Sequence, residues 1–489
     1  MADDDDIDEL KAKRLCHQCI GEEYLKVEVR RKGKRRQCSY CDRNVQSFTI
    51  EDIADRVETA FEQHFRRTSD QPTSWQQSLL SDRESDYEWE REGELVMWAI
   101  ANVAEIPDQA AQDIQTVLGD KYSDFEFAAM GEETEFCSES YYEEKGSSDH
   151  VWQEEWSNFE RSLKTEARFF SRSAAAHLTS IFNGIDKMRT IDGRPLVIDA
   201  GPQTALTAVF RARVFQSDEK LKEALCRPDH HLGSPPAVLA VAGRMNARGI
   251  SVFYGATDPS VAIAEIRPPV GSQVAVARFS IVRPLRLLDL TALSAVVTED
   301  GSVFDPGWAA KLERATFLRS LSQRITKPVM PDDEAFEYLP TQAIADFLAT
   351  ENEPLLDGVL FPSVQVAGVG LNVVLFHKAA LVEAMEIPAG MEIDASTGST
   401  SEDGWEVDYS VCEQLPPNES TKEKDEEGQW SGLITFLDGA WCAGDADFRE
   451  PALRIDLESI KVHVVRSVKF ECNAHNVRRH RLGKIGTEL

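Results

Sequence analysis

The spacing of apolar residues divides the chain into two regions. From Glu51 onward they recur every fourth position, which places one apolar stripe on a helix, at Ile53, Val57, Phe61 and Phe65. Helical patterns return over residues 94–104 and 152–185. In the second of these, the side chains expected to face the core are Trp156, Phe159, Leu163, Phe170 and Leu178. Residues 51–190 are therefore predicted to be mostly helical.

After Asp192 the pattern changes to short β-branched runs separated by Gly and Pro. These runs are LVIDAG, TAVFRARVF, ISVFYGA, QVAVARFSIV, LRLLDL, GVLFPSV and NVVLFH. They predict the strands of a mixed α+β domain over residues 191–387. The alternating run LRIDLESIKVHVVRSVKF, within residues 451–489, is expected to return as a strand of the same domain.

Two acidic stretches interrupt these patterns. EETEFCSESYYEEKGSSDH, residues 132–150, ends in a Gly-Ser-Ser break and is interpreted as an exposed connection. Residues 388–450 are acidic and rich in Ser, Thr, Gly and Pro, which predicts a partly disordered insertion. At 489 residues the chain exceeds one typical core, so several structural units are expected.

Two cysteine pairs near the start form the strongest local signal. Cys16 and Cys19 are followed after eighteen residues by Cys38 and Cys41. Two such pairs supply four thiolates for a tetrahedral zinc ion, and unligated thiols are the alternative. Four Cys ligands leave no position for water, so the predicted zinc is structural. The other five cysteines, at 137, 226, 412, 442 and 472, show no disulfide-like spacing.

The segment between the pairs completes a predicted zinc ribbon over residues 1–50. Leu25, Val27 and Val29 alternate with charged residues before Gly33, which suggests a β-hairpin. Its basic tip, Arg30 to Arg36, is either solvated or contacts nucleic acid or an acidic surface.

Charge and composition limit the partners. The formal net charge of -31 makes nucleic acid an unlikely main partner, because nucleic-acid binders need excess Lys and Arg. The start MADDDDIDELKAKR lacks the features of a signal peptide, and no apolar run reaches about 18 residues. A cytoplasmic protein with no membrane contact is expected.

One carboxylate stands out in the second region. Asp258 and Pro259 are typical of a helix start, as N-cap and first-turn residue. The run VAIAEI then places Glu265 among small and apolar residues, where a carboxylate is costly unless it has a partner or a task. A surface glutamate two residues before Arg267 is the alternative.

The preceding turn carries candidate anion-binding groups. GRMNARG, residues 243–249, combines flexible glycines with Arg244 and Asn246, which can approach a phosphate. A turn capped by Asn246 is the alternative. His230 and His231 precede Gly233 and are interpreted as loop residues rather than metal ligands.

In this order the pieces resemble the RES domain family, named for Arg, Glu and Ser residues. The resemblance rests on Phe210-Arg211, GRMN, Val252-Phe-Tyr254, Glu265 eleven residues later, Phe361-Pro-Ser363 and Gly370-Leu-Asn372. The cysteine pairs and the helical region ending in KTEARFF resemble the HEPN/RES N-terminal domain. Met245 departs from the family, in which many members carry an aromatic residue.

The resemblance implies a fold related to ADP-ribosyltransferases and a bacterial toxin that consumes NAD, by phosphorolysis in some members. Glu265 would stabilise an oxocarbenium-like state on the ribose. Arg211 would pair with the NAD pyrophosphate or with inorganic phosphate, and Tyr254 would stack on nicotinamide or hydrogen-bond a ribose hydroxyl. Substrate-binding roles are implied for Arg244, Asn246, Ser363 and Asn372.

Three functions are compatible with these features. The first is NAD phosphorylase or glycohydrolase activity, the second is protein ADP-ribosylation, and the third is a zinc-ribbon sensor or adaptor with a regulatory RES-like part. Because NAD consumption harms the host, a restraint is expected. It is an antitoxin, another inhibitor protein, or the N-terminal 190 residues themselves.

Overall fold

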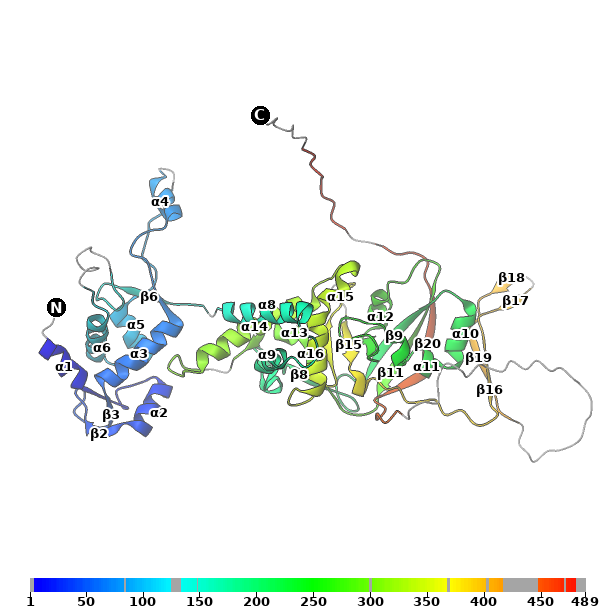
Figure 1. Ribbon diagram of the computed structural model, residues 1–489, viewed down its shortest axis with the longest axis horizontal. Helices are drawn as coiled ribbons and strands as arrows, with labels where there is room; N and C mark the ends of the chain where they lie inside the picture. Colours follow the sequence, from blue (N-terminus) through cyan, green and yellow to red (C-terminus); the bar gives the residue numbers. More distant parts are fainter. Residues whose placement is uncertain are drawn as a thin grey trace, which may run out of the picture. The chain divides into compact units, whose positions relative to one another are not determined.

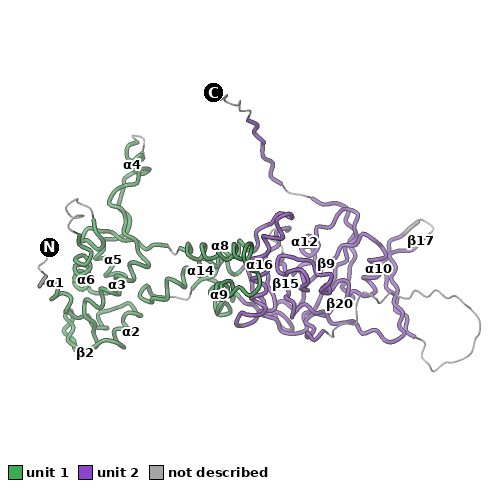
Figure 2. Tube along the Cα trace, viewed as in Figure 1, with its two compact units in different colours: residues 1–196, 292–325 green, residues 197–291, 326–489 purple. Residues whose placement is uncertain are grey.

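The computed structural model describes residues 4–82, 85–124, 133–146, 148–298, 301–366, 370–401, 404–416, 447–469 and 472–480. It divides into two compact units, Met1–Leu196 with Ala292–Ile325 and Val197–Thr291 with Thr326–Leu489 (Figure 2). Within the described ranges, no helix is long and apolar enough to cross a membrane.

The first unit opens with helices around a small antiparallel sheet of order β1-β3-β2. Its elements are α1 (Asp4–Ala12), β1 (Arg14–Cys16), α2 (Glu23–Lys32), β2 (Lys34–Gln37), β3 (Asn44–Thr49) and α3 (Ile50–His64). Thr49 and Asp52 form a capping box that starts α3. Ile53, Val57 and Phe61 are buried as predicted, and Phe65 begins β4 (Phe65–Arg67).

The predicted hairpin over residues 24–37 is wrong. Residues 23–32 form α2, which starts where the Glu22 carboxylate accepts a hydrogen bond from the Leu25 amide at 2.7 Å. Leu25 and Val29 are fully buried, whereas Val27 is 57% exposed. Apolar residues four apart share a helix face, and the alternation through Val27 imitated a strand. Of the predicted hairpin, only the second half, β2, is a strand, and it pairs with β3.

A second sheet of order β4-β6-β5 corrects another expectation. Residues 133–146 are more than an exposed connection, because Phe136 and Tyr142 are 3% and 4% exposed and belong to the core. Their rings stack with centroids 5.4 Å apart. The surrounding elements are α4 (Ser74–Ser81), β5 (Glu94–Leu95), α5 (Val96–Ala104), α6 (Asp108–Lys121) and β6 (Tyr141–Glu144).

The rest of the first unit packs two helices against a later one. Trp156, Phe159, Leu163 and Leu178 are buried as predicted, but Phe170 is fully exposed between α8 and α9, so its assignment to the core is wrong. Arg314 donates to the carbonyls of Ile181 and Asn183. The elements are α8 (His150–Thr165), α9 (Arg172–Phe182), η1 (Ile185–Lys187), β7 (Arg189–Thr190), α13 (Leu290–Leu293), β13 (Val296–Val297) and α14 (Trp308–Thr326).

The second unit is built on an eight-stranded mixed sheet of order β20-β11-β9-β10-β15-β14-β12-β8 (Figure 1). The predicted strand runs and the mixed α+β class are confirmed. Only β12 and β14 pair in parallel among these neighbours. The strands are β8 (Val197–Ala200), β9 (Ala208–Phe215), β10 (Phe253–Ala256), β11 (Gln273–Ile281), β12 (Leu285–Asp289), β14 (Gly358–Pro362), β15 (Leu371–Leu375) and β20 (Leu453–Val464).

Helical segments accompany this sheet. His230 and His231 lie in the helical turn α11, so their assignment to a loop is wrong, and the only metal-binding group found in the described ranges does not include them. The helical segments are α10 (Asp218–Cys226), α11 (Pro228–His231), η2 (Ala237–Leu239), α12 (Pro259–Glu265), η3 (Pro331–Asp333), α15 (Glu334–Glu337), α16 (Leu339–Thr350) and η4 (His377–Ala379).

The two faces of the sheet carry separate cores. Val209, Phe215 and Phe253 belong to a large core on one face. Ala212 and Ala256 belong to a smaller core that includes Val261 and Ala262 of α12. Because successive side chains of a strand point to opposite faces, α12 covers the face opposite Phe253.

Beyond this sheet lie two small antiparallel strand pairs. They are β16 (Glu392–Ser396) with β19 (Ser410–Gln414) and β17 (Ser399–Ser401) with β18 (Gly404–Glu406). Residues 417–446, the middle of the expected insertion, lie outside the described residues.

Candidate functional site

Helix α12 brings Glu265 to the sheet. As predicted, Asp258 is the N-cap, where its carboxylate accepts from the Ser260 amide at 2.8 Å, and Pro259 is the first helical residue. Glu265 is the last residue of this seven-residue helix. Arg267 follows with a φ of 44°, which turns the chain away.

Two side chains hold one oxygen of the Glu265 carboxylate. The Ser363 hydroxyl and the Asn372 amide donate to Glu265 Oε1 at 2.6 and 2.8 Å. Ser363 also accepts from the amides of Gln365 and Val366 at 3.1 and 3.3 Å, which fixes the hydroxyl. No donor to Glu265 Oε2 is found in the described part of the chain, so this oxygen remains available to a ligand.

Tyr254 is fixed by the GRMN turn. Its hydroxyl donates to Asn246 Oδ1 at 2.9 Å and accepts from the Met245 amide at 3.0 Å. The approach is so close that a Cβ on Gly243 would lie 2.6 Å from the Tyr254 hydroxyl, which explains the glycine. Burial raises the pKa of Tyr254 to about 12, so the phenol is neutral at neutral pH.

Asn246 lies behind Tyr254 and is 3% exposed. Its Nδ2 donates to the carbonyls of Val241, Ala247 and Ile250 at 2.9, 3.1 and 3.0 Å. With both ends of the amide engaged within the protein, Asn246 positions the turn and Tyr254.

Arg244 extends from the same turn toward Tyr338. Its guanidinium carbon lies 5.0 Å from the Tyr338 ring centroid, and Nη2 donates to the Lys327 carbonyl at 2.9 Å. Thr341 and Gln342 of α16 donate to the carbonyls of Arg244 and Gly243 at 2.6 and 2.8 Å. The segment around Tyr338 therefore supports the turn.

These residues surround a cavity of about 340 Å³. This volume falls in the range of small-molecule sites. Among the lining residues are Arg244, Tyr254, Glu265, Arg267, Glu334, Tyr338, Gln365 and Asn372. The cavity thus combines two carboxylates, of which Glu265 is held by two donors, with two guanidinium groups and two phenol rings.

Comparison with known families assigns both parts of the chain. Residues 212–395 match the RES domain, and residues 31–177 match HEPN/RES N-terminal domain 1. The chain is a RES-domain protein. No curated protein and no solved structure gave a match. RES domains are in general NAD-consuming toxin domains, so the matched part of the chain implies an NAD-processing enzyme.

In this RES-domain protein Arg211 is not among the residues that line the Glu265 cavity. It shares its side of β9 with Val209 and Phe215, and its guanidinium carbon lies 4.8 Å from the Phe253 ring centroid. Its Nη1 is buried without a partner in the described part of the chain. Burial and the nearby Arg213 lower the pKa of Arg211 to about 10, so it stays charged at neutral pH.

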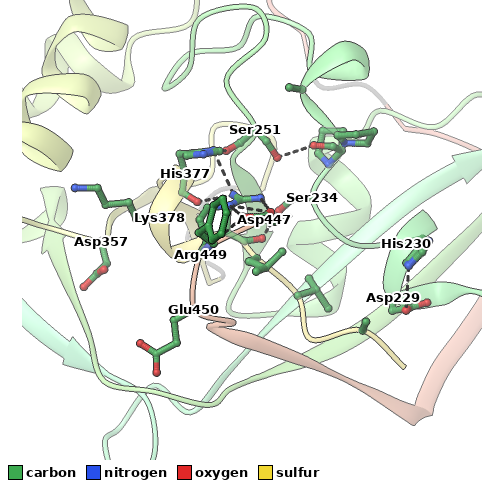
Figure 3. A pocket seen from close by; sticks show the side chains of 18 of the residues that line it. Asp229, His230, Ser234, Ser251, Asp357, His377, Lys378, Asp447, Arg449 and Glu450 are labelled. Carbon is green, nitrogen blue, oxygen red and sulfur yellow. Dashed lines mark hydrogen bonds and ion pairs between the residues drawn. The ribbon is translucent and has the colours of Figure 1, made fainter. Parts of the chain in front are cut away.

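A larger cavity of about 1110 Å³ lies at the other ends of β10, β14 and β15 (Figure 3). Its charged groups largely satisfy each other. Arg449 pairs with Asp447 and donates to the His377 carbonyl at 2.7 Å, and Arg283 lies 3.7 Å from Asp357. This larger cavity contains none of the predicted catalytic or substrate-binding residues. The smaller cavity beside Glu265 is therefore the candidate active site.

The four cysteines of the RES-domain protein form one cluster, with all four sulfur atoms within 4.8 Å of one another. Sγ separations are 3.7 Å for Cys16–Cys19, 3.5 Å for Cys16–Cys41 and 3.9 Å for Cys19–Cys38. A tetrahedron with Zn–S bonds of about 2.3 Å has edges of about 3.8 Å. The donor set therefore fits a structural zinc, as predicted.

Several cavity residues were not recognised in the sequence. With its amide oriented to satisfy its hydrogen bonds, Gln365 accepts from Arg267 at 2.7 and 3.3 Å. Tyr338 donates to Glu334 at 3.1 Å. In the sequence, Arg267 is only a neighbour of Glu265 that would fit a surface position for this glutamate. Tyr338 lies in a segment without a motif.

Proposed function

We propose that this chain cleaves the bond between nicotinamide and ribose in NAD. The observation that supports this most is the Glu265 carboxylate, held on one oxygen by Ser363 and Asn372 at the wall of a ligand-sized cavity.

Cleavage develops positive charge on the ribose as the C1′–N bond breaks and nicotinamide leaves with the bonding electrons. A carboxylate fixed beside C1′ stabilises that charge more than it stabilises the ground state. Because Oε1 is already held, the carboxylate needs little reorganisation, and a group of this kind contributes roughly 3 kcal/mol. An acceptor oxygen then attacks C1′ and loses its proton.

The cationic groups support binding of the anionic part of the substrate. Arg244 and Arg267 both line the cavity and suit phosphate oxygens. Tyr254, a neutral phenol held by Asn246, offers its ring to the nicotinamide side. We assign Arg211 a supporting role through its charge, since its side chain lies against Phe253 on the other side of β9.

The same two guanidinium groups favour an anionic acceptor, inorganic phosphate, over water. With NAD and phosphate the expected products are nicotinamide and ADP-ribose phosphorylated at the anomeric carbon. Without phosphate, free ADP-ribose would identify a glycohydrolase, and label on protein would identify an ADP-ribosyltransferase. Unchanged NAD at high enzyme concentration would contradict the proposal.

A further inference from the structure

A third cavity, of about 440 Å³, lies wholly within the first compact unit. It is formed by the segment around β7, the end of β13 and the first turns of α14. The residues that line it are Lys187, Met188, Arg189, Val297, Thr298, Gly301, Asp305, Trp308, Lys311 and Arg314. None of them belongs to the proposed NAD-cleaving site.

The charge of this cavity is opposite to that of the chain. Four of its residues are cationic and one, Asp305, is acidic, although the chain has 84 acidic and 53 basic residues. Asp305 accepts from the Gly307 amide at 3.0 Å and lies 3.4 Å from Lys311. No carboxylate of the described ranges pairs with Lys187, Arg189 or Arg314. The cavity thus carries uncompensated positive charge.

Arg314 is a fixed member of this group. Its Nη2 donates to the carbonyls of Ile181 and Asn183 at 2.7 and 2.6 Å, and its Nε donates to Ile181 at 3.0 Å. These bonds to the end of α9 orient the guanidinium without neutralising it. An anion entering the cavity would meet a preorganised charge.

An aromatic ring lies beside the cations. Trp308, Lys311 and Arg314 follow at intervals of three along α14, so they are neighbours on the helix surface. A Cβ on Gly301 would lie 2.1 Å from Cε3 of Trp308, so a glycine is required to seat the ring. The half-buried indole N–H has no acceptor within the described structure.

We propose that this cavity binds a small phosphorylated compound with a flat ring, of the nucleoside phosphate class. The phosphates would contact Lys187, Arg189, Lys311 and Arg314, and the ring would lie against Trp308. The site is separate from the Glu265 cavity and gives the protein a second ligand. Two of its cationic residues, Lys187 and Arg189, precede the matched RES domain.

The test is calorimetric titration of the full-length protein with ADP at low salt. The double variant Lys187→Ala/Arg189→Ala removes two exposed cations, and Lys220→Ala/Arg286→Ala is the matched charge control. Arg244→Ala reports binding in the Glu265 cavity instead. Adenosine and inorganic phosphate are titrated separately as the two parts of the probe.

ADP is expected to bind the wild-type chain roughly tenfold or more tightly than the Lys187→Ala/Arg189→Ala variant. The charge control should bind it like the wild type, and adenosine alone should bind more weakly than ADP. Arg244→Ala should lose only the ADP binding that belongs to the Glu265 cavity and should keep the binding that depends on Lys187 and Arg189. The proposal is overturned if the wild type does not bind ADP or if the Lys187→Ala/Arg189→Ala variant binds it equally well. Equal binding of adenosine, or a loss seen only in Arg244→Ala, also overturns it.

Discussion

The Ser363 hydroxyl donates to Glu265 Oε1 at 2.6 Å across 98 residues of sequence. The strand register makes this contact, since Phe361 of β14 pairs with Asn372 of β15. Ser363 follows β14 directly, so the same pairing brings both donors to the end of α12. The carboxylate is therefore oriented by strand pairing rather than by its own helix.

Replacing Glu265 by Gln should remove the charge while keeping the shape. If the carboxylate stabilises the oxocarbenium-like state, kcat for NAD should fall by about 10²- to 10³-fold. Nicotinamide release measures this, and Glu219→Gln on α10 is a control for the loss of one exposed acidic charge. A Glu265→Gln protein that is folded and fully active would exclude the proposed mechanism.

Replacing Ser363 by Ala tests the positioning of the carboxylate. Ser363 contacts Glu265 and does not line the cavity, so kcat should fall by roughly tenfold while KM stays close to the wild-type value. Arg267→Ala should do the reverse and raise KM, because Arg267 lines the cavity. If Ser363→Ala changed only KM, the serine would bind substrate instead.

The fold of the second unit was largely predictable because its strands are short β-branched runs bounded by turn residues. Errors arose where one local pattern fitted two structures. Leu25, Val27 and Val29 alternate like a strand, and only packing shows that Val27 faces outward. Phe170 fits a helical stripe, but its positive φ of 61° places it in the turn between two helices.

The site was predictable in its motifs and not in its arrangement. Family order identified Glu265, Ser363 and Asn372, which the structure brings together. Whether Arg211 faces the Glu265 cavity depends on which face of the sheet α12 covers. Tertiary packing decides this, and the sequence pattern does not show it. Arg267 and Tyr338 reach the cavity through a turn and a distant segment, and neither leaves a periodic signal.

The extent of the first unit could not be read from the sequence either, because a later segment packs against the helices before residue 190. Residues 292–325 belong to the first compact unit, where Arg314 binds the carbonyls of Ile181 and Asn183. A fragment starting at residue 191 should therefore be less stable than one starting at residue 148, which retains α8 and α9. Thermal melts of both fragments test this, and the longer one is the better fragment for measuring inhibition by the N-terminal region.

Removing zinc should unfold the N-terminal part and leave NAD turnover intact, because the Glu265 cavity lies in the other unit. Structural zinc in small sites contributes about 10 to 16 kcal/mol of apparent binding free energy. Cys38→Ser should lower the zinc content and the first melting transition, with the exposed Cys412→Ser as control. Full zinc content in Cys38→Ser would refute the assigned ligand set.

Two histidines with buried Nε2 atoms predict the pH dependence of stability. Burial lowers the pKa of His64 and of His177 below the ordinary value of 6.5, and Nε2 of each is buried without a partner in the described structure. The unfolded chain therefore binds more protons once the pH falls below about 6.5, so the free energy of unfolding decreases there. Each histidine contributes a slope of at most about 1.4 kcal/mol per pH unit. Denaturant melts of His64→Gln between about pH 5 and 7 should show a shallower slope than the wild type, and the exposed His463→Gln should not. An identical slope in all three proteins would mean that His64 is not the group that titrates.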